Sequence, residues 1–258
     1  IDTRSYATIM SLSIYAMHPV ALTGVAGAGK STVARALLRE LAPQSDSSLQ
    51  DTSNRGMNQL ACQNVLTVPL HFSMHTDSRA TQSSIMRPLQ VQQSARHLAA
   101  PKQHKVVVFV DDFNMPAKDI SGAQAPIELL RQLLDSGGLL DRAKADWTRV
   151  SDVTVLAAGA PPASGRTRVS DRFMRHCHVL CMPSPSQKTM SLIFSAIVSG
   201  FLRDASFNFS DNIKQLTASL VGASIAAYDR SAAKFLPTPT NPHHAFNMRD
   251  LAEIFRGF

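Results

Sequence analysis

The chain is poor in cysteine, in aromatic residues and in long apolar runs, and each shortage excludes a class of protein. Its three cysteines, Cys62, Cys177 and Cys181, are too few and odd in number for a disulfide framework, so we expect a reducing compartment, the cytoplasm. No run approaches the roughly 20 apolar residues of a membrane-spanning helix, so we expect no membrane partner. The first residues lack an initiator methionine and a signal-peptide pattern, and we expect a piece of a longer polypeptide.

Positive charge is in excess but is not concentrated. The sequence has 26 Lys and Arg against 19 Asp and Glu, a net charge of +7. Nucleic-acid binding is one interpretation, but the chain has no run of Lys or Arg and no aromatic residues interleaved with them. A phosphate ligand and an acidic neighbouring surface explain the excess equally well, so we expect no nucleic-acid partner.

What the chain does contain is a complete phosphate-binding motif. Residues 24–31 read Gly-Val-Ala-Gly-Ala-Gly-Lys-Ser, between an apolar run and a helix-forming stretch. In that setting backbone N–H groups turn inward around an anion, Lys30 reaches the β/γ-phosphates and the Ser31 hydroxyl meets Mg²⁺. A glycine-rich turn with an incidental lysine is the alternative interpretation. The predicted nucleotide-binding residues are Gly24, Gly27, Ala28, Gly29, Lys30, Ser31 and Thr32.

The pattern along the chain predicts strands alternating with helices. Continuous apolar strands in this alternation indicate a parallel, doubly wound sheet with ligands at the carboxyl ends of its strands. The predicted strands are residues 19–23, 66–72, 105–110, 153–158 and 178–182, and the predicted helices 1–17, 30–41, 78–97 and 125–135. Residues 43–64 are polar and aperiodic, and we expect a flexible insertion there.

From residue 186 onward the pattern predicts helices alone. We expect them over residues 186–202, 210–230 and 247–256, with a proline-rich stretch before the last one. We therefore predict a nucleotide-binding α/β domain over residues 1–184 and a small helical lid domain over residues 185–258.

A second motif consists of two acids after the buried strand 105–110. A carboxylate at this strand end faces the phosphate loop across the sheet, so we expect Asp111 to join Ser31 in holding Mg²⁺. The next acid, Asp112, stands where hydrolytic relatives place the group that polarises the attacking water. Asp is one methylene shorter than Glu, which questions its reach.

Longer strings extend these motifs. Residues 109–118 read Phe-Val-Asp-Asp-Phe-Asn-Met-Pro-Ala-Lys, and residues 122–132 read Gly-Ala-Gln-Ala-Pro-Ile-Glu-Leu-Leu-Arg-Gln. Further stretches are residues 159–162 with Gly165 and Arg166, residues 172–176, and residues 237–239, 241–244 and 246–251. In order and spacing these strings resemble the third AAA+ unit of dynein heavy chains, of axonemal dyneins in particular. The resemblance covers nearly the whole chain except residues 43–64.

The resemblance implies a P-loop AAA+ module: a five-stranded parallel sheet sandwiched by helices, then a helical lid. It implies ATP or ADP with Mg²⁺ as ligands, and neighbouring AAA+ units of the same heavy chain as partners. Microtubules and dynein intermediate and light chains are implied as partners of the parent protein, in the cytoskeleton of a cilium or flagellum axoneme. In this family the third unit regulates a motor whose main hydrolysis occurs elsewhere.

The resemblance also implies residue roles. Arg249 matches the second-sensor arginine, which reaches from the lid toward the γ-phosphate, although an ordinary exposed arginine is the alternative. Arg172 and Arg175 lie where AAA+ proteins place an arginine finger that serves the adjacent unit's nucleotide. The sequence does not choose between these two.

Two hypotheses about turnover remain open. The end of the predicted strand 153–158 reads Ala158-Gly159-Ala160, which offers no polar side chain to orient water, and the insertion is unexplained. The chain is either an ATP-binding, slowly hydrolysing unit or a catalytically silent nucleotide-binding scaffold. A free-standing P-loop ATPase is a more distant alternative.

Overall fold

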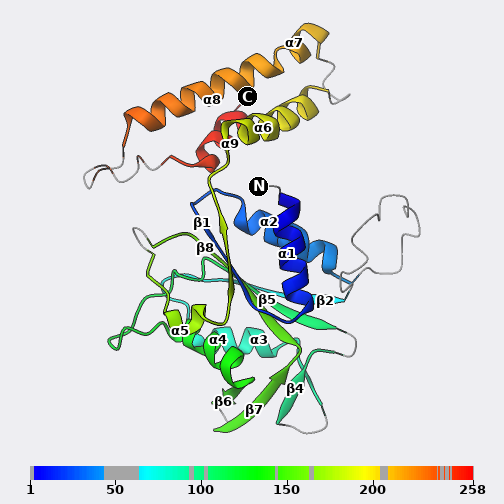
Figure 1. Cartoon of the computed structure of the whole chain (residues 1–258), viewed down its shortest axis with the longest axis vertical. Coiled ribbons are helices and arrows are strands. Elements are labelled where there is room, and N and C mark those ends of the chain that lie inside the picture. Colours follow the sequence, from blue (N-terminus) through cyan, green and yellow to red (C-terminus); the bar gives the residue numbers. More distant parts are fainter. Residues whose placement is uncertain are drawn as a thin grey trace. The chain divides into compact units, whose positions relative to one another are not determined.

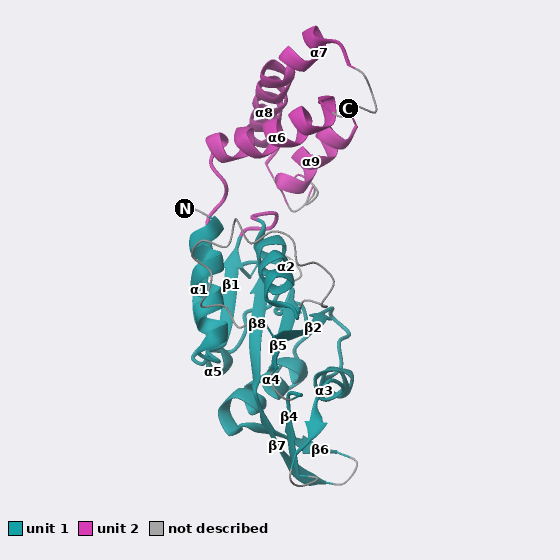
Figure 2. Cartoon of the chain, turned by 90° about the vertical axis from the view of Figure 1, so that its right-hand side faces the viewer, with its two compact units in different colours: residues 1–24, 29–182 teal, residues 25–28, 183–258 magenta. Residues whose placement is uncertain are grey.

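The computed structural model of the chain describes residues 3–43, 64–92, 96–101, 104–142, 145–162, 166–203, 209–236, 238, 241, 244 and 246–257. The expected flexible insertion at residues 43–64 lies almost entirely outside these described residues. Two compact units are present, and Figure 2 shows them in different colours. The first comprises Ile1–Gly24 and Gly29–Met182, and the second comprises Val25–Ala28 and Pro183–Phe258.

The first unit alternates strands and helices. Its helices are α1 (Thr3–Tyr15), α2 (Lys30–Leu41), α3 (Ser78–Met86), α4 (Ala125–Ser136) and α5 (Asp171–Met174). Its strands are β1 (Val20–Gly24), β2 (Val65–His71), β3 (Gln90–Val91), β4 (His97–Ala99), β5 (Lys105–Asp111), β6 (Gly138–Asp141), β7 (Asp146–Ser151), β8 (Val153–Gly159) and β9 (His178–Met182).

The main sheet is parallel throughout. Among the described residues it has five strands in the order β2-β5-β8-β1-β9, and every neighbouring pair is parallel. Strand β5, between β2 and β8, is buried on both faces because its apolar residues alternate between them. Val106, Val108 and Val110 join the core cluster that includes Ile127 of α4 and Phe173 of α5. Helices flank this sheet (Figure 1), so the predicted α/β architecture is confirmed.

The predicted helix over residues 78–97 is wrong beyond Met86. Helix α3 ends there because Pro88 has no N–H to continue the helical hydrogen bonds. Strands β3 and β4 follow and join a second sheet, whose described strands have the order β3-β4-β7-β6. The sequence does not predict this sheet, because its strands are short and two of them continue directly from a helix or into β8.

The second unit contains α6 (Gln187–Leu202), α7 (Asp211–Gln215), α8 (Thr217–Lys234) and α9 (Met248–Arg256). The predicted helix 210–230 is divided at Leu216 and continues to Lys234. In the core of the second unit, the buried apolar residues of α6 and of α8 lie one helical turn apart. The buried members are Met190, Phe194 and Val198 of α6, Val221 and Ile225 of α8, and Leu251 of α9. Within the described residues, no helix has both the length and the apolar character needed to cross a bilayer.

Candidate nucleotide-binding site

The phosphate motif begins at the carboxyl end of β1, and its first glycine is required sterically. Gly24 has φ of 149°, and a Cβ on this residue would lie 2.2 Å from the backbone oxygen of Met182 on β9. Gly29, at φ 89°, is the N-cap of α2 in the left-handed region, which glycine adopts without steric cost. The next residue, Lys30, is buried, and its Nζ donates to Gly24 O at 2.8 Å. Its ammonium group is therefore held at the loop's entrance.

The two predicted magnesium ligands are in direct contact. Ser31 Oγ donates to Asp111 Oδ1 at 2.6 Å, which brings the first turn of α2 to the end of β5. The other carboxylate oxygen, Oδ2, pairs with Arg35 at 2.9 Å and lies 3.9 Å from His71 Nδ1. Asp111 is thus fixed by contacts on both oxygens. Arg35 lies one helical turn after Ser31, a spacing that places both on one helix face. Thr32 is exposed.

Asp112 lies in a turn directly after β5. Its φ of 52° is in the left-handed region, which Asp tolerates better than most residues do. Its O accepts from the Met115 N–H at 2.9 Å, and the Phe113 N–H donates to Ala158 O at 3.2 Å. The carboxylate is half-exposed, and Oδ1 lies 3.8 Å from Nη2 of Arg166.

Asn114 occupies the position where the sequence suggested no polar side chain. The end of β8 consists of Ala158 and Gly159, but a Cβ on Gly159 would lie 3.1 Å from Oδ1 of Asn114. Asn114 is 3% exposed, and its Nδ2 donates to Ala160 O at 2.6 Å. A buried amide therefore covers this strand end. The sequence alone predicts no role for Asn114 or Arg166.

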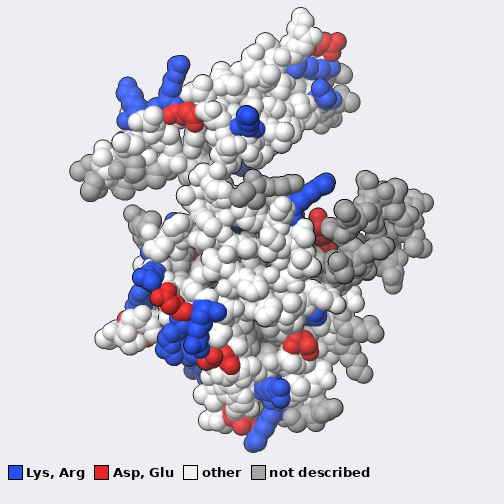
Figure 3. Space-filling model, viewed as in Figure 1, with Lys and Arg blue, Asp and Glu red and all other residues white. Residues whose placement is uncertain are grey.

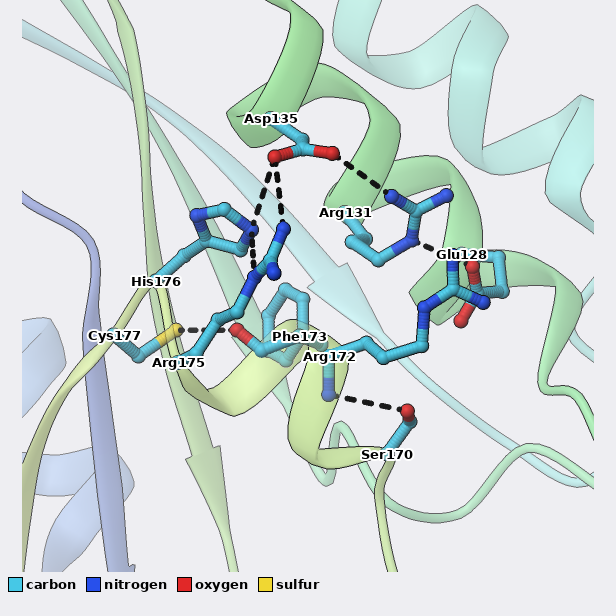
Figure 4. Close-up of polar contacts among 9 residues, drawn as sticks. All are labelled: Glu128, Arg131, Asp135, Ser170, Arg172, Phe173, Arg175, His176 and Cys177. Carbon is cyan, nitrogen blue, oxygen red and sulfur yellow. Dashed lines mark hydrogen bonds and ion pairs between the residues drawn. The ribbon is translucent and has the colours of Figure 1, made fainter.

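The two arginine-finger candidates on and after α5 differ in their contacts. Arg175 is tied to α4 by an ion pair with Asp135 Oδ1 at 3.1 Å, as Figure 4 shows. The Arg172 side chain has no hydrogen bond or ion pair with any described residue; only its backbone N–H donates, to Ser170 Oγ. Arg172 also lines a cavity of about 500 Å³. The cavity is bounded by α4, α5 and the segment before each.

In the second unit, loop residues lie against the helix that carries Arg249. Helix α9 begins with a capping box, in which Asn247 Oδ1 accepts from the Arg249 N–H at 2.8 Å. Gly27 belongs to the same unit, and a Cβ on it would lie 3.1 Å from the Met248 nitrogen. Ala28 closes the loop turn through its N–H to Val25 O at 3.3 Å. Arg249 is exposed, and its side chain has no polar partner among the described residues.

Charged residues of both signs lie together over α4 and α5. Figure 3 shows blue and red side chains interleaved over α4 and α5. Ion pairs account for this pattern, including Arg131 with Glu128 at 2.7 Å and Arg168 with Asp171 at 3.0 Å. The hydrogen bond to Glu128 raises the pKa of Arg131 further above its usual value.

Comparisons with known proteins agree with this arrangement. The family described as "P-loop containing dynein motor region" matches residues 51–185, and an "AAA+ lid domain" matches residues 220–258. Dynein axonemal heavy chain 6 of Homo sapiens is 39% identical over 256 residues, which is 99% of this chain and 6% of that protein. Dynein axonemal heavy chain 12 of Mus musculus is 33% identical over 99% of this chain and 8% of its own length.

Dynein axonemal heavy chain 2 of Mus musculus is 31% identical over the whole chain, which spans 5% of that protein. The chain therefore corresponds to less than a tenth of the length of each of these relatives. A P-loop strand–loop–helix unit, a parallel sheet and a helical second unit are together what a AAA+ module requires. The chain belongs to the dynein heavy chain family and is one of its nucleotide-binding AAA+ modules.

Proposed function

We propose that this module is the third AAA+ unit of an axonemal dynein heavy chain and that it binds ATP or ADP with Mg²⁺ to regulate the motor. The observation that carries the proposal is the joint geometry of Lys30, Ser31 and Asp111. A buried ammonium at the loop entrance and a hydroxyl bonded to a carboxylate are the groups that phosphates and their metal need. The strings of residues 109–118 and 122–132 support the assignment to the third unit.

The residues present fit a magnesium ion. Ser31 and Asp111 supply a hydroxyl and a carboxylate, both hard oxygen ligands, within hydrogen-bonding distance of each other. When bound, the ion neutralises charge on the phosphate oxygens. The chain's own part is to orient the Ser31 and Asp111 oxygens toward the ion. Ser31 is held by the start of α2, and Asp111 is held by its second contact, with Arg35.

Asp112 is the proposed base that polarises water. It follows Asp111 in the chain, and its half-exposed carboxylate is open to water. The short Asp side chain predicts slow hydrolysis. The second candidate function is a silent nucleotide-binding scaffold. The end of β8 favours it, because Ala158 and Gly159 provide no side chain to orient water and the Asn114 Nδ2 that covers them is bonded to Ala160 O.

Two arginines are proposed to act on two different nucleotides, one bound by this module and one bound by the preceding module. Arg249 is proposed to reach this module's own γ-phosphate, and the contact between Gly27 and the start of α9 supports that role. Arg172 is proposed to serve the nucleotide of the preceding module. It is favoured over Arg175 because its guanidinium is uncommitted among the described residues and borders a cavity, whereas Arg175 is engaged with Asp135.

Partners and location follow from the relatives. Three related proteins are named as axonemal dynein heavy chains, and we propose the axoneme of a cilium or flagellum as the place of action. Neighbouring AAA+ units of the same heavy chain are the direct partners. Microtubules and dynein intermediate and light chains are partners of the parent protein.

The test is photolabelling of the full heavy chain with azido-ATP that carries its radiolabel on either the α- or the γ-phosphate. The α-label recovered on peptides of this module reports that a nucleotide is bound there. The γ-label recovered on the same peptides reports nucleotide that has not been cleaved. We expect α-label in the wild type and its loss in Lys30→Ala, with Arg39→Ala as a matched control on α2. Absence of α-label in the wild type would contradict nucleotide binding.

The ratio of the two labels separates the two candidate functions. Loss of γ-label over time in the wild type would support a hydrolysing unit. Equal retention of both labels, with γ-label lost only in Asp112→Glu, would support the silent scaffold.

A further inference from the structure

Two polar side chains near the end of β8, the buried Asn114 and the partly exposed Arg166, each have a buried atom without a hydrogen bond. Among the residues that the structure describes, Asn114 Oδ1 and Arg166 Nε have no hydrogen-bond partner, although both atoms are enclosed by protein. Such atoms are costly, because water has been removed from them and nothing replaces it. One is an acceptor and the other a donor, so a single hydrogen bond between them would satisfy both.

The two side chains come from segments that are bonded to each other. Thr167, the residue after Arg166, donates its backbone N–H to Asn114 O at 3.1 Å and its hydroxyl to the same oxygen at 3.2 Å. Asn114 is anchored on the other side by its Nδ2 bond to Ala160 O. The backbone therefore keeps the base of the Arg166 side chain beside Asn114, whichever way the guanidinium turns.

In this structure the guanidinium is turned toward Asp112. The distance of 3.8 Å between Nη2 and Oδ1 is long for a charged pair, and the Asp112 side chain is 50% exposed. Such pairs are weak and exchange readily with other partners. A guanidinium beside the carboxylate nevertheless competes with water for its oxygens.

We propose that Arg166 is a positioning residue that alternates between the Asp112 carboxylate and the Asn114 amide oxygen, and that Asp112 serves water only in the second arrangement. The inference rests on the role of Asp112 in the proposed function. It gives this module a restraint on hydrolysis that is built from its own side chains. The Asn114 amide is then the group that releases the base.

The test compares variants with opposite expected effects in the full heavy chain, with α- and γ-labelled azido-ATP as probes. Arg166→Gln removes the restraint, and loss of γ-label from this module should accelerate about two- to fivefold, the range that a half-exposed ion pair allows. Asn114→Leu removes the alternative partner and should slow it. The α-label should stay unchanged in both, and Arg168→Gln, in the same segment but paired with Asp171, is the control.

A merely structural role would give a different pattern. It would shift both variants in the same direction or lower the α-label in both, and either result would overturn the proposal. If Asn114→Leu fails to fold, Asn114→Asp takes its place. Its charge should hold Arg166 more strongly and therefore accelerate loss of γ-label.

Hydrogen exchange of the full heavy chain, without nucleotide, tests the contact independently of hydrolysis. The amides of Phe113 and Met115 close the turn around Asp112 and should exchange about two- to fivefold faster in Arg166→Gln. In an Asp112→Asn background the same substitution should have no further effect. An equal acceleration there would refute the contact. If the wild type binds no label, or never loses γ-label, the proposed function fails instead, and the exchange result still decides the role of Arg166.

Discussion

Asp111 is the residue on which the site converges, because its two oxygens have different partners. Oδ1 accepts from Ser31 and Oδ2 pairs with Arg35. The arginine partly neutralises the carboxylate that a divalent cation would use, so it competes with the metal for the same charge. Arg35 also lies 5.9 Å from the centre of the Phe109 ring, which helps to hold its guanidinium at this place.

Replacing Arg35 by Gln should therefore strengthen magnesium binding. We expect the Mg²⁺ concentration for half-maximal α-label incorporation to fall about two- to fivefold, the effect of removing one partly exposed charge. Arg39→Gln, one turn further along α2, is the control and should leave it unchanged. A higher Mg²⁺ requirement in Arg35→Gln would mean that the arginine supports the metal site.

The two described cysteines should differ sharply in reactivity. Burial raises the pKa of Cys177 to about 12, whereas Cys181 is exposed. At pH 8 the thiolate fraction of Cys177 should be about a thousandfold lower than that of a cysteine with the usual pKa of 9.0. Iodoacetamide labelling followed by peptide mass spectrometry should modify Cys181 and spare Cys177. Comparable labelling of both would contradict the described burial.

The sign of the linked stability change follows from the same shift. Above about pH 9 the unfolded chain loses the Cys177 proton while the folded chain keeps it. The free energy of unfolding should therefore fall as the pH rises from 9 toward 12. Cys177→Ala should reduce this slope.

At the scale of residues, sequence motifs predicted the site where its members are close in the chain. Lys30 and Ser31 belong to one motif, and the strand before Asp111 marks that acid. Arg35 was missed because it meets Asp111 across 76 positions of the sequence, although its spacing from Ser31 was a usable signal. Asn114 was missed as a cover for β8 because a gap left by small residues in one strand is filled from another segment.

At the scale of elements, the close contact between β1 and β9 depends on Gly24. Gly24→Ala would place a Cβ 2.2 Å from Met182 O, and we expect a loss of about 3 kcal/mol or more in the free energy of unfolding. Gly137 is the C-cap of α4 at φ 61°, and a Cβ on it would have no neighbouring atom within 4 Å among the described residues. Gly137→Ala should therefore cost only about 1–2 kcal/mol. Urea denaturation of both variants checks the order, and equal losses would contradict it.

Periodicity predicted the main sheet well and the peripheral elements poorly. Strands such as β5 are continuous apolar runs because helices cover both faces, and such runs are recognisable without knowledge of their neighbours. Pro88 was the signal in the sequence for the end of α3. Strand β6 follows α4 directly and β7 continues into β8. Both carry little apolar pattern, so their pairing is defined only by the tertiary structure.

At the scale of the whole molecule, the two candidate finger arginines should act differently. Arg172→Ala should slow the rate at which the preceding module loses γ-label about a thousandfold, the effect expected of a missing arginine finger. Arg175→Ala removes one exposed contact with Asp135 and should change it less than about fivefold. Photolabelling of that module in the full heavy chain checks both variants, and a larger loss in Arg175→Ala would reverse the assignment.

Trp147 is the chain's single tryptophan, and its place in β7 decides what fluorescence can report. It is 37% exposed, and its indole packs so closely on Gly138 of β6 that a Cβ there would lie 2.8 Å from Cε2. Intrinsic emission therefore follows the small sheet of the first unit. A denaturation curve recorded by tryptophan fluorescence would not report the unfolding of the second unit. Two-state behaviour in that signal would therefore describe only the first unit. An extrinsic dye on the second unit would make its transition visible.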